Sequence, residues 1–171
     1  MSRFPTGVSV ITTLTNDGKP WGMTCSSLTS VSLSPPVLSV CLGTWSRTLA
    51  AVQTHGRLAV NLLGVRGLAA AEIFASAGPG QFDSVPWDAA DGSGLPRLRD
   101  AMGFAVCRLM GTHGVGDHVV VFGEVLSVDL GIEVPLLYGL RQFAVWPGEG
   151  MPATAVPSGD ERAGEPTAFQ T

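Results

Sequence analysis

Alternating runs of β-branched and other apolar residues, separated by turn residues, constrain the fold of this chain most strongly. The run Gly7–Thr15 alternates as a half-buried strand does, and Asn16–Gly18 is a tight-turn signal before a return strand that begins at Lys19. Further strand-like runs cover Val37–Leu42, Arg57–Leu63, 102–113, 118–130 and 135–146. The pattern predicts antiparallel strands joined by short turns.

Two short helices interrupt these strands. The first is predicted over Ser46–Thr54, with Ser46 as its N-cap and Gly56 just past its end. The second is an Ala-rich segment over Gly67–Ser76, followed by a loop that runs to about Pro96. Six or seven strands with so few helices do not make βαβ units. We therefore predict a mainly β fold, an antiparallel barrel rather than a doubly wound sheet.

Length and composition predict one folded domain with a polar tail. The 171 residues fit a single domain, which we place at 1–147, and residues 148–171 are rich in Pro, Gly, Ala and Thr and read as a flexible tail. The net charge is −4 and no basic block is present, which argues against nucleic acid as a partner. The 45% hydrophobic content predicts that a partner subunit covers part of the surface.

Cysteine usage and the absence of apolar spans predict a cytoplasmic protein. Cys25, Cys41 and Cys107 are odd in number and widely spaced, without a CxxC pair or a Cys/His zinc spacing. No apolar run approaches the roughly 20 residues of a membrane span. The N-terminus lacks the basic and apolar pattern of a signal peptide. We expect no metal site, no disulfide framework and no membrane association.

The common catalytic motifs are also missing. The chain has no G-x-G-x-x-G after a strand, no P-loop, no H-E-x-x-H and no G-x-S-x-G. Three other places carry polar residues in unusual patterns. They are the serine-rich stretch Gly22–Pro36, the helix start at Ser46, and His118 at the head of a strand.

Each of these places has both a ligand-binding and a structural interpretation. Small residues on extended backbone at 24–27 allow a flavin ring to approach, but the serines would also satisfy their own backbone in a turn. Ser46, Arg47 and Thr48 at a helix N-terminus suit a phosphate, although Ser46 would equally serve as a plain cap. His118 would hydrogen-bond a nicotinamide amide, or simply face water at a strand end.

Six segments in this order resemble the flavin reductase-like family, which has the FMN-binding split-barrel fold. They begin at Phe4 with "FPTGVSVITT" and continue through the serine-rich stretch, "SRTLAAV", the strand ending in "AVNLL", "GDHVVVFGEV" and "PLLYGLRQF". Together they span nearly all of 4–143. The resemblance implies an antiparallel, Greek-key-like split β-barrel with two or three short helices.

The resemblance also implies a role for each candidate site residue. Thr24, Cys25, Ser26 and Ser27 would line the isoalloxazine ring, with Ser39, Val40 and Cys41 on the neighbouring strand. Ser46, Arg47 and Thr48 would hold the ribityl phosphate, while Gln81 and Phe82 would close over the flavin. His118 would contact the nicotinamide as the catalytic residue, and Tyr138 to Arg141 would complete that side.

The chain departs from the family pattern at three places. Cys25 stands where a small unreactive residue is usual, and reduced flavin with peroxide would oxidise it if it were exposed. Gln81 replaces a residue that is often basic, and Leu140 with Arg141 replaces a basic–glycine pair.

The function implied by the resemblance is NAD(P)H-dependent reduction of FMN, with FAD as an alternative flavin and NADH or NADPH as the hydride donor. Reduced flavin would diffuse to a partner flavin-dependent monooxygenase or halogenase, and the protein would be a homodimer. Two alternatives remain at this point. One is a non-catalytic FMN carrier of the same fold, and the other is an oxidase similar to the pyridoxamine phosphate oxidases.

Overall fold

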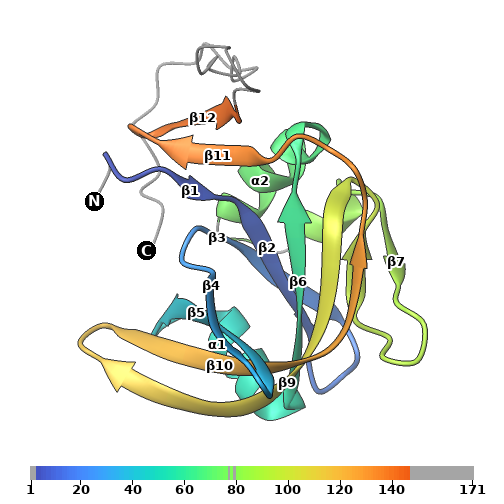
Figure 1. Ribbon diagram of the computed structural model, residues 1–171. Helices are drawn as coiled ribbons and strands as arrows, with labels where there is room; N and C mark the ends of the chain where they lie inside the picture. The colour runs from blue at the N-terminus through green and yellow to red at the C-terminus, as the bar shows by residue number, and fades with distance from the viewer. Residues whose placement is uncertain (1–2, 77, 79, 147–171) are drawn as a thin grey trace.

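A computed structural model describes residues 3–76, 78 and 80–146, and these form a mainly β structure (Figure 1). Every strand pairing in it is antiparallel. The predicted fold class is therefore confirmed. The tail predicted at 148–171 lies outside the described residues.

The largest sheet has seven strands in the order β3-β2-β6-β9-β10-β5-β4. These strands are β3 (Pro20–Cys25), β2 (Ser9–Leu14), β6 (Arg57–Leu63), β9 (Ala101–Val115), β10 (His118–Leu130), β5 (Pro36–Gly43) and β4 (Thr29–Leu33). β9 and β10 form a long hairpin that projects beyond the rest of the sheet (Figure 1). A shift of register between Phe122 and Gly123 breaks this pairing, as expected for a glycine at a bend.

Two smaller sheets complete the strands. One joins β1 (Thr6–Gly7), β11 (Leu136–Gly139) and β12 (Gln142–Val145), and it lies at the opposite end of the molecule from the β9–β10 hairpin (Figure 1). The other is a short hairpin of β7 (Trp87–Ala89) and β8 (Pro96–Leu98).

Both predicted helices form, each within a residue or two of its expected bounds. α1 covers Arg47–His55, and the Ser46 side chain accepts a hydrogen bond from the Leu49 N–H as its N-cap. Gly56 ends α1 in the left-handed conformation at φ 75°, which costs glycine nothing because it has no Cβ. α2 covers Leu68–Ala75, and single turns of 3-10 helix occur at η1 (Val65–Gly67) and η2 (Gln81–Asp83).

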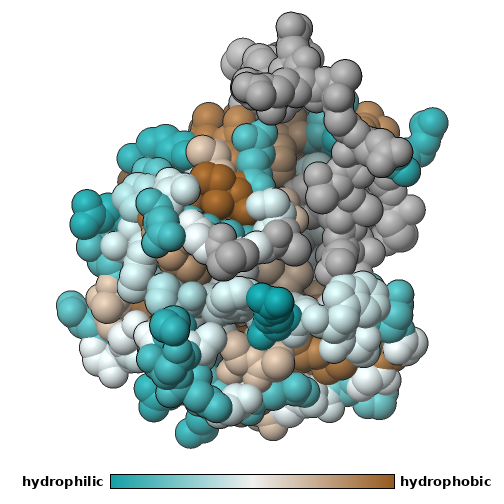
Figure 2. Space-filling model, turned by 180° about the vertical axis from the view of Figure 1, so that it is seen from behind, coloured by the Kyte–Doolittle hydropathy of each residue, from teal (hydrophilic) through white to brown (hydrophobic). Residues whose placement is uncertain are grey.

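Three apolar clusters hold these elements together, and the third consists of Ala59, Leu95, Phe104 and Val106. The first lies between α1 and the strands β2, β5, β6, β9 and β10, and it is centred on Val40, Leu58 and Val121. The second joins α2 to β1–β2 and the β11–β12 hairpin through Val10, Phe74 and Leu136. On the face seen in Figure 2, the strongly hydrophobic residues appear as separate patches among polar and weakly hydropathic ones.

Three local expectations need correction. The predicted loop up to Pro96 contains η2 and the β7–β8 hairpin, because Val85, Leu95 and Leu98 are buried there. The serine-rich stretch is not a simple turn, since it supplies the end of β3 and all of β4. The last strand-like run is a hairpin that turns at Leu140 and Arg141. These two residues have positive φ angles of 55° and 63°, which sequence signals for turns do not anticipate without Gly, Asn or Asp.

Candidate functional site

The serine-rich stretch joins two ends of the sheet through the Ser27 hydroxyl. The pairing of β4 with β5 ends at Thr29, which lies opposite Ser39. Cys41, two residues further along β5, therefore lies beyond the end of that pairing. The Cys41 N–H donates to Ser27 Oγ over 2.8 Å, and Ser27 Oγ lies 3.2 Å from the Cys41 carbonyl oxygen. The hydroxyl thus occupies the place that a further β4 residue would take, and its hydrogen-bonding capacity is largely used inside the protein.

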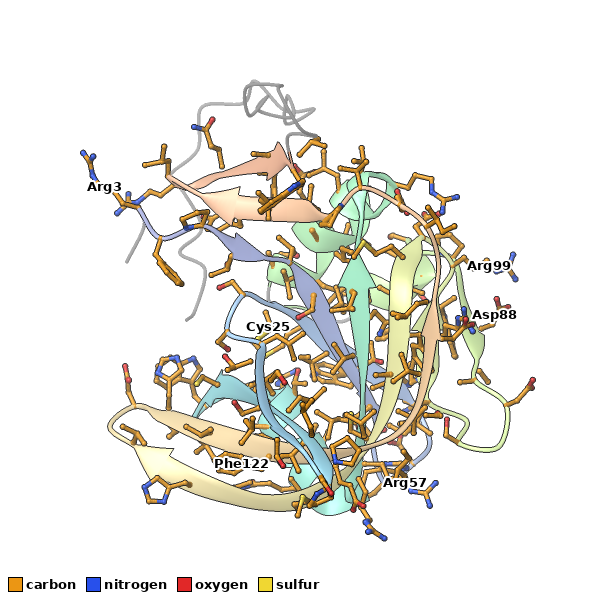
Figure 3. The ribbon with its side chains drawn as sticks, in the orientation of Figure 1. Arg3, Cys25, Arg57, Asp88, Arg99 and Phe122 are labelled. Atoms are coloured by element: carbon orange, nitrogen blue, oxygen red, sulfur yellow. The ribbon has the colours of Figure 1, made fainter. Side chains whose placement is uncertain are left out.

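Thr24 and Cys25, at the end of β3, are buried. Thr24 is 3% exposed, and its hydroxyl donates to the Ala71 carbonyl of α2 over 2.7 Å. The Cys25 sulfur lies 3.1 Å from Ser27 Oγ, and burial raises the pKa of the Cys25 thiol. In Figure 3, Cys25 lies between the small upper sheet and β10, which carries Phe122. Ser26 is partly exposed, so among residues 24–27 the backbone and Ser26 are the groups most accessible to a ligand.

β5 supplies the next three predicted residues. Val40 is fully buried in the first apolar cluster, whereas Ser39 and Cys41 on either side of it are partly exposed on the other face. This alternation follows from the period of two in a strand. Ser39 and Cys41 therefore share a face of the sheet, and Val40 contributes packing beneath it.

The N-terminus of α1 lies beside the β3 strand. Ser46 Oγ is 3.2 Å from the Met23 sulfur, and the Arg47 guanidinium lies 5.7 Å from the Trp21 ring centroid. Arg47 is exposed, while Thr48 is 2% exposed. A helix start presents backbone N–H groups without intrahelical partners and the positive end of the helix dipole. Together with Arg47, these groups fit an anionic phosphate.

His118 begins β10 directly opposite Gly43 at the end of β5. Its Nδ1 lies 2.8 Å from Asp117 Oδ1, and its ring meets Trp45 edge-on at 6.0 Å between centroids. The hydrogen bond with His118 holds the pKa of Asp117 below its usual range. His118 Nε2 is buried and has no hydrogen-bond partner among the described residues.

Gln81 and Phe82 lie against α2. The Gln81 amide donates to the Ser76 carbonyl over 2.6 Å and to the Ile73 carbonyl over 3.3 Å, so it caps the end of the helix. Phe82 packs edge-on against Phe74 at 4.8 Å. Because the Thr24 hydroxyl is bonded to the same helix, α2 connects this pair to the β3 side of the site.

Tyr138 and Arg141 lie on the β11–β12 hairpin. Tyr138 pairs with Thr6 across β1 and packs against Phe143 at 5.2 Å, and burial raises the pKa of its hydroxyl. Arg141 is exposed at the tip of the hairpin. This hairpin packs into the second apolar cluster, together with Phe82, and not into the first cluster beneath β5.

The predicted residues thus form two groups. Contacts or strand register join Ser27, Cys41, Ser46, Arg47 and His118 around the ends of β3, β5 and β10. Gln81, Phe82 and Tyr138 gather around the second cluster, with α2 between the groups. Sequence reasoning did not assign Trp45 and Asp117 to the site. The sequence features that could have indicated these two residues are a tryptophan directly before the helix cap and a carboxylate next to the candidate histidine.

The accessible groups suit a flat ligand that carries a phosphate. They comprise strand backbone with small side chains and a helix start with an arginine. His118 adds a buried nitrogen that has no hydrogen-bond partner among the described residues. In the part of the chain that the structure describes, no cluster of three or more His, Cys, Asp or Glu residues could hold a metal ion. Within that part, none of the helices is long and apolar enough to cross a membrane.

Comparisons with known proteins identify the family. Residues 1–147 match the description "Flavin reductase like domain". The flavin reductase (NADPH) of Lentzea aerocolonigenes is 52% identical over 151 residues, which are 88% of this chain and 88% of that protein. The NADH:FAD oxidoreductase SgcE6 of Streptomyces globisporus, solved with NAD and FAD fragments, has a TM-score of 0.82 at 31% identity, covering 87% of this chain and 90% of its own.

A further solved structure connects the fold with two-component systems. BorF, the flavin reductase component of a bacterial two-component tryptophan halogenase, has a TM-score of 0.79 at 30% identity, covering 86% of this chain and 94% of its own. This chain belongs to the flavin reductase-like family. The predicted family and the predicted enzyme class are confirmed, and the matches support neither the carrier nor the oxidase alternative.

Proposed function

We propose that this protein oxidises NADH or NADPH, reduces FMN, and supplies the reduced FMN to a partner monooxygenase or halogenase. The observation that carries the proposal is that the start of α1 at Ser46 and Arg47 follows the end of β5, directly opposite which β10 begins with His118, whose Nε2 has no hydrogen-bond partner among the described residues. A phosphate and a nicotinamide amide are the ligand groups that this pair of sites suits.

The residues of the first group have complementary binding roles in this proposal. Ser46 and Arg47 hold the flavin phosphate, and Thr48 supports them from inside the helix. The backbone of residues 24–27 and the exposed face of Ser39 and Cys41 lie along the ring, with Val40 packed beneath. When bound, a flavin supplies the acceptor for the hydride of the nicotinamide, which carries two electrons and one proton.

The remaining residues bind the second substrate and exclude water. His118 Nε2 hydrogen-bonds the nicotinamide carboxamide. Tyr138 with Arg141, from the second group of residues, extends over that side from the β11–β12 hairpin. Gln81 and Phe82 close the site from α2. Hydride transfer needs the two rings stacked at about 3–3.5 Å and little acid–base assistance, so these residues act mainly by positioning. This accounts for a site without paired carboxylates.

Steady-state kinetics with the purified protein test the activity. We expect NAD(P)H oxidation that increases with added FMN, and a loss of about tenfold or more in kcat/KM for NAD(P)H in His118→Ala. Running FMN against FAD, and NADH against NADPH, measures both preferences. Tight FMN binding without turnover would instead favour the carrier, and oxygen uptake that requires a pyridoxamine ester would favour the oxidase.

Release of reduced flavin has its own test. The reductase and a flavin-dependent oxygenase or halogenase are placed on opposite sides of a membrane that passes FMN but not protein. Product formation under low oxygen supports diffusion of the reduced flavin. Product that forms only when the two proteins share a compartment would contradict it.

The assembly, location and domain limits complete the proposal. We propose a homodimer in the cytoplasm, with the catalytic domain at 1–147 and a dispensable tail at 148–171. The apolar side chains Leu126, Val128 and Leu130 on β10 are exposed, which supports the proposal that a second subunit covers this surface. Removing residues 148–171 should leave FMN-dependent turnover unchanged.

A further inference from the structure

We propose that Trp21 is a positioning residue, which holds the Arg47 guanidinium for the flavin phosphate without neutralising its charge. The inference deepens the proposed function and rests on it for the identity of the anion. Trp21 belongs to β3, just before the serine-rich stretch Gly22–Pro36, and the contact that carries the inference is between its ring and Arg47.

One face of β3 supports the start of α1. Successive residues of a strand point to opposite faces, so Trp21 and Met23 share a face. Met23 Sδ lies 3.2 Å from Ser46 Oγ, and the Trp21 ring centroid lies 5.7 Å from the Arg47 guanidinium carbon. Pairing with Thr13 of β2 fixes the backbone that carries Trp21. The two side chains of β3 therefore contact two consecutive residues at the start of α1.

The Arg47 guanidinium has an aromatic partner instead of a carboxylate. Four other arginines, Arg66, Arg97, Arg99 and Arg108, form ion pairs with Asp or Glu, whereas Arg47 forms none within the part of the chain that the structure describes. A carboxylate would use the N–H donors of the guanidinium and neutralise its charge. An aromatic ring attracts the cation through its face and takes none of these donors. The donors and the charge of Arg47 are thus left for an anion.

The ring contact also prepares Arg47 for binding. An exposed arginine populates many rotamers, and fixing them when a ligand binds opposes association. Contact with Trp21 restricts these rotamers before the ligand arrives. A cation–π contact at an exposed site corresponds to about a two- to fivefold change in affinity. The effect should be confined to ligands that Arg47 contacts, and in the proposed function the group that it contacts is the FMN phosphate.

Equilibrium binding of FMN and riboflavin, followed by flavin fluorescence, tests this role, because riboflavin has the same ring system without the phosphate. The wild type should bind FMN more tightly than riboflavin, and Arg47→Ala should lose this preference. Trp21→Leu should weaken FMN binding by about two- to fivefold and leave riboflavin binding unchanged. Trp21→Phe should lie between Trp21→Leu and the wild type, because it retains an aromatic face. Trp146→Leu, at an exposed tryptophan, is the matched control and should change neither constant.

Two further variants separate an orienting role from packing. In the Arg47→Ala protein, adding Trp21→Leu should have no further effect on FMN affinity, because the ring then has no guanidinium to hold. Difluorotryptophan at position 21 nearly keeps the shape of the side chain but weakens the negative face of its ring, so FMN affinity should fall without a loss of stability. In the Trp21 variants, KM for FMN should rise while kcat and KM for NAD(P)H stay unchanged.

Three results would overturn the inference. The first is an unchanged FMN affinity in Trp21→Leu, and if this variant does not fold, the difluorotryptophan protein decides instead. The second is an equal loss of FMN and riboflavin affinity, which indicates packing of the whole site. The third is a loss in Trp21→Leu that persists in the Arg47→Ala protein.

Failure of the proposed function gives a different result. A wild type that binds FMN and riboflavin equally would remove the phosphate from Arg47, and the phosphate site of the proposed function would fail together with this inference. A wild type that prefers FMN, and whose preference depends on Arg47 but not on Trp21, contradicts the inference alone.

Discussion

Single buried polar residues determine several contacts between distant strands. Asn61 in β6 is the clearest case, because its side chain is fully buried and bonded to two other strands, β2 and β8. Its Nδ2 donates to the Val10 carbonyl over 3.2 Å and to Thr12 Oγ1 over 3.1 Å, and its Oδ1 accepts from the Leu98 N–H over 2.8 Å. A strand-like sequence run does not reveal such a role, since each partner comes from elsewhere in the chain.

We therefore expect Asn61→Leu to destabilise the protein. The substitution keeps a similar volume but leaves the buried Leu98 N–H unpaired, which should lower the free energy of unfolding by about 2–4 kcal/mol. Urea denaturation followed by circular dichroism measures the change. The exposed substitution Gln53→Leu on α1 serves as a control, and equal midpoints for the two variants would contradict the role of Asn61.

The three cysteines should differ in reactivity. Burial raises the pKa of the Cys25 thiol, and raises that of Cys107 to about 12, whereas Cys41 is partly exposed. Because the thiolate is the reactive form, a disulfide reagent at pH 8 should modify about one thiol rapidly in the native protein and all three after denaturation. Cys41→Ser should remove the fast phase. A fast phase that survives this substitution would mean that Cys25 is open to oxidation after all.

At the scale of elements, connections between strands depend on a few local features. The β11–β12 turn places Leu140 and Arg141 at positive φ, although neither is a residue that favours this conformation. A second connection, from β10 to β11, is held by Glu133. Its carboxylate accepts hydrogen bonds from the Arg66 N–H over 2.8 Å and from the Arg66 guanidinium over 3.2 Å.

Relief of the strained turn should stabilise the protein. Leu140→Asn replaces a residue that tolerates the left-handed region poorly with one that tolerates it well, which should raise the free energy of unfolding by about 0.5–1 kcal/mol. Thermal denaturation measures the gain.

Arg141→Gly should stabilise similarly, but it should also raise KM for NAD(P)H if Arg141 covers the nicotinamide as proposed. An unchanged KM would remove Arg141 from the site.

The Glu133 contact should make stability depend on pH. Burial by itself raises the pKa of Glu133, but the hydrogen bonds and the charge of Arg66 together outweigh it and hold the pKa in the folded protein below the ordinary value of 4.5. The stabilisation is therefore complete above the unfolded pKa and is lost as the pH falls through the lower folded pKa. Glu133→Gln should be less stable than the wild type by about 1 kcal/mol at pH 7. The difference should shrink in denaturation curves as the pH falls below 4.5, and a difference independent of pH would contradict this explanation.

At the scale of the whole molecule, the β9–β10 hairpin leaves an apolar surface exposed. The pairing of β10 with β5 ends at Glu124, so no described strand pairs with that edge of residues 126–130. Leu126, Val128 and Leu130 on this segment are 46%, 56% and 69% exposed. A free strand edge with apolar side chains is a surface that proteins usually cover.

We expect a second copy of the chain to cover it. Light scattering should give a dimer mass for the wild type, and Val128→Lys combined with Leu130→Lys should shift the mass toward a monomer. Val65→Lys, at another exposed apolar residue, should leave the dimer intact. A wild-type monomer at micromolar concentration would contradict the proposed assembly.

The sequence by itself determined the elements whose signals are local. Alternating residues predicted the main strands, and Ser46 and Gly56 marked the ends of α1, because hydrophobic period and capping depend on neighbouring residues. The order of the motifs along the chain identified the family. Tertiary structure decided the rest. The Ser27 bridge to Cys41, the partners of Asn61 and the Asp117–His118–Trp45 arrangement each require segments brought together by folding. Local periodicity carries no information about which distant groups will meet, so these contacts became visible only in three dimensions.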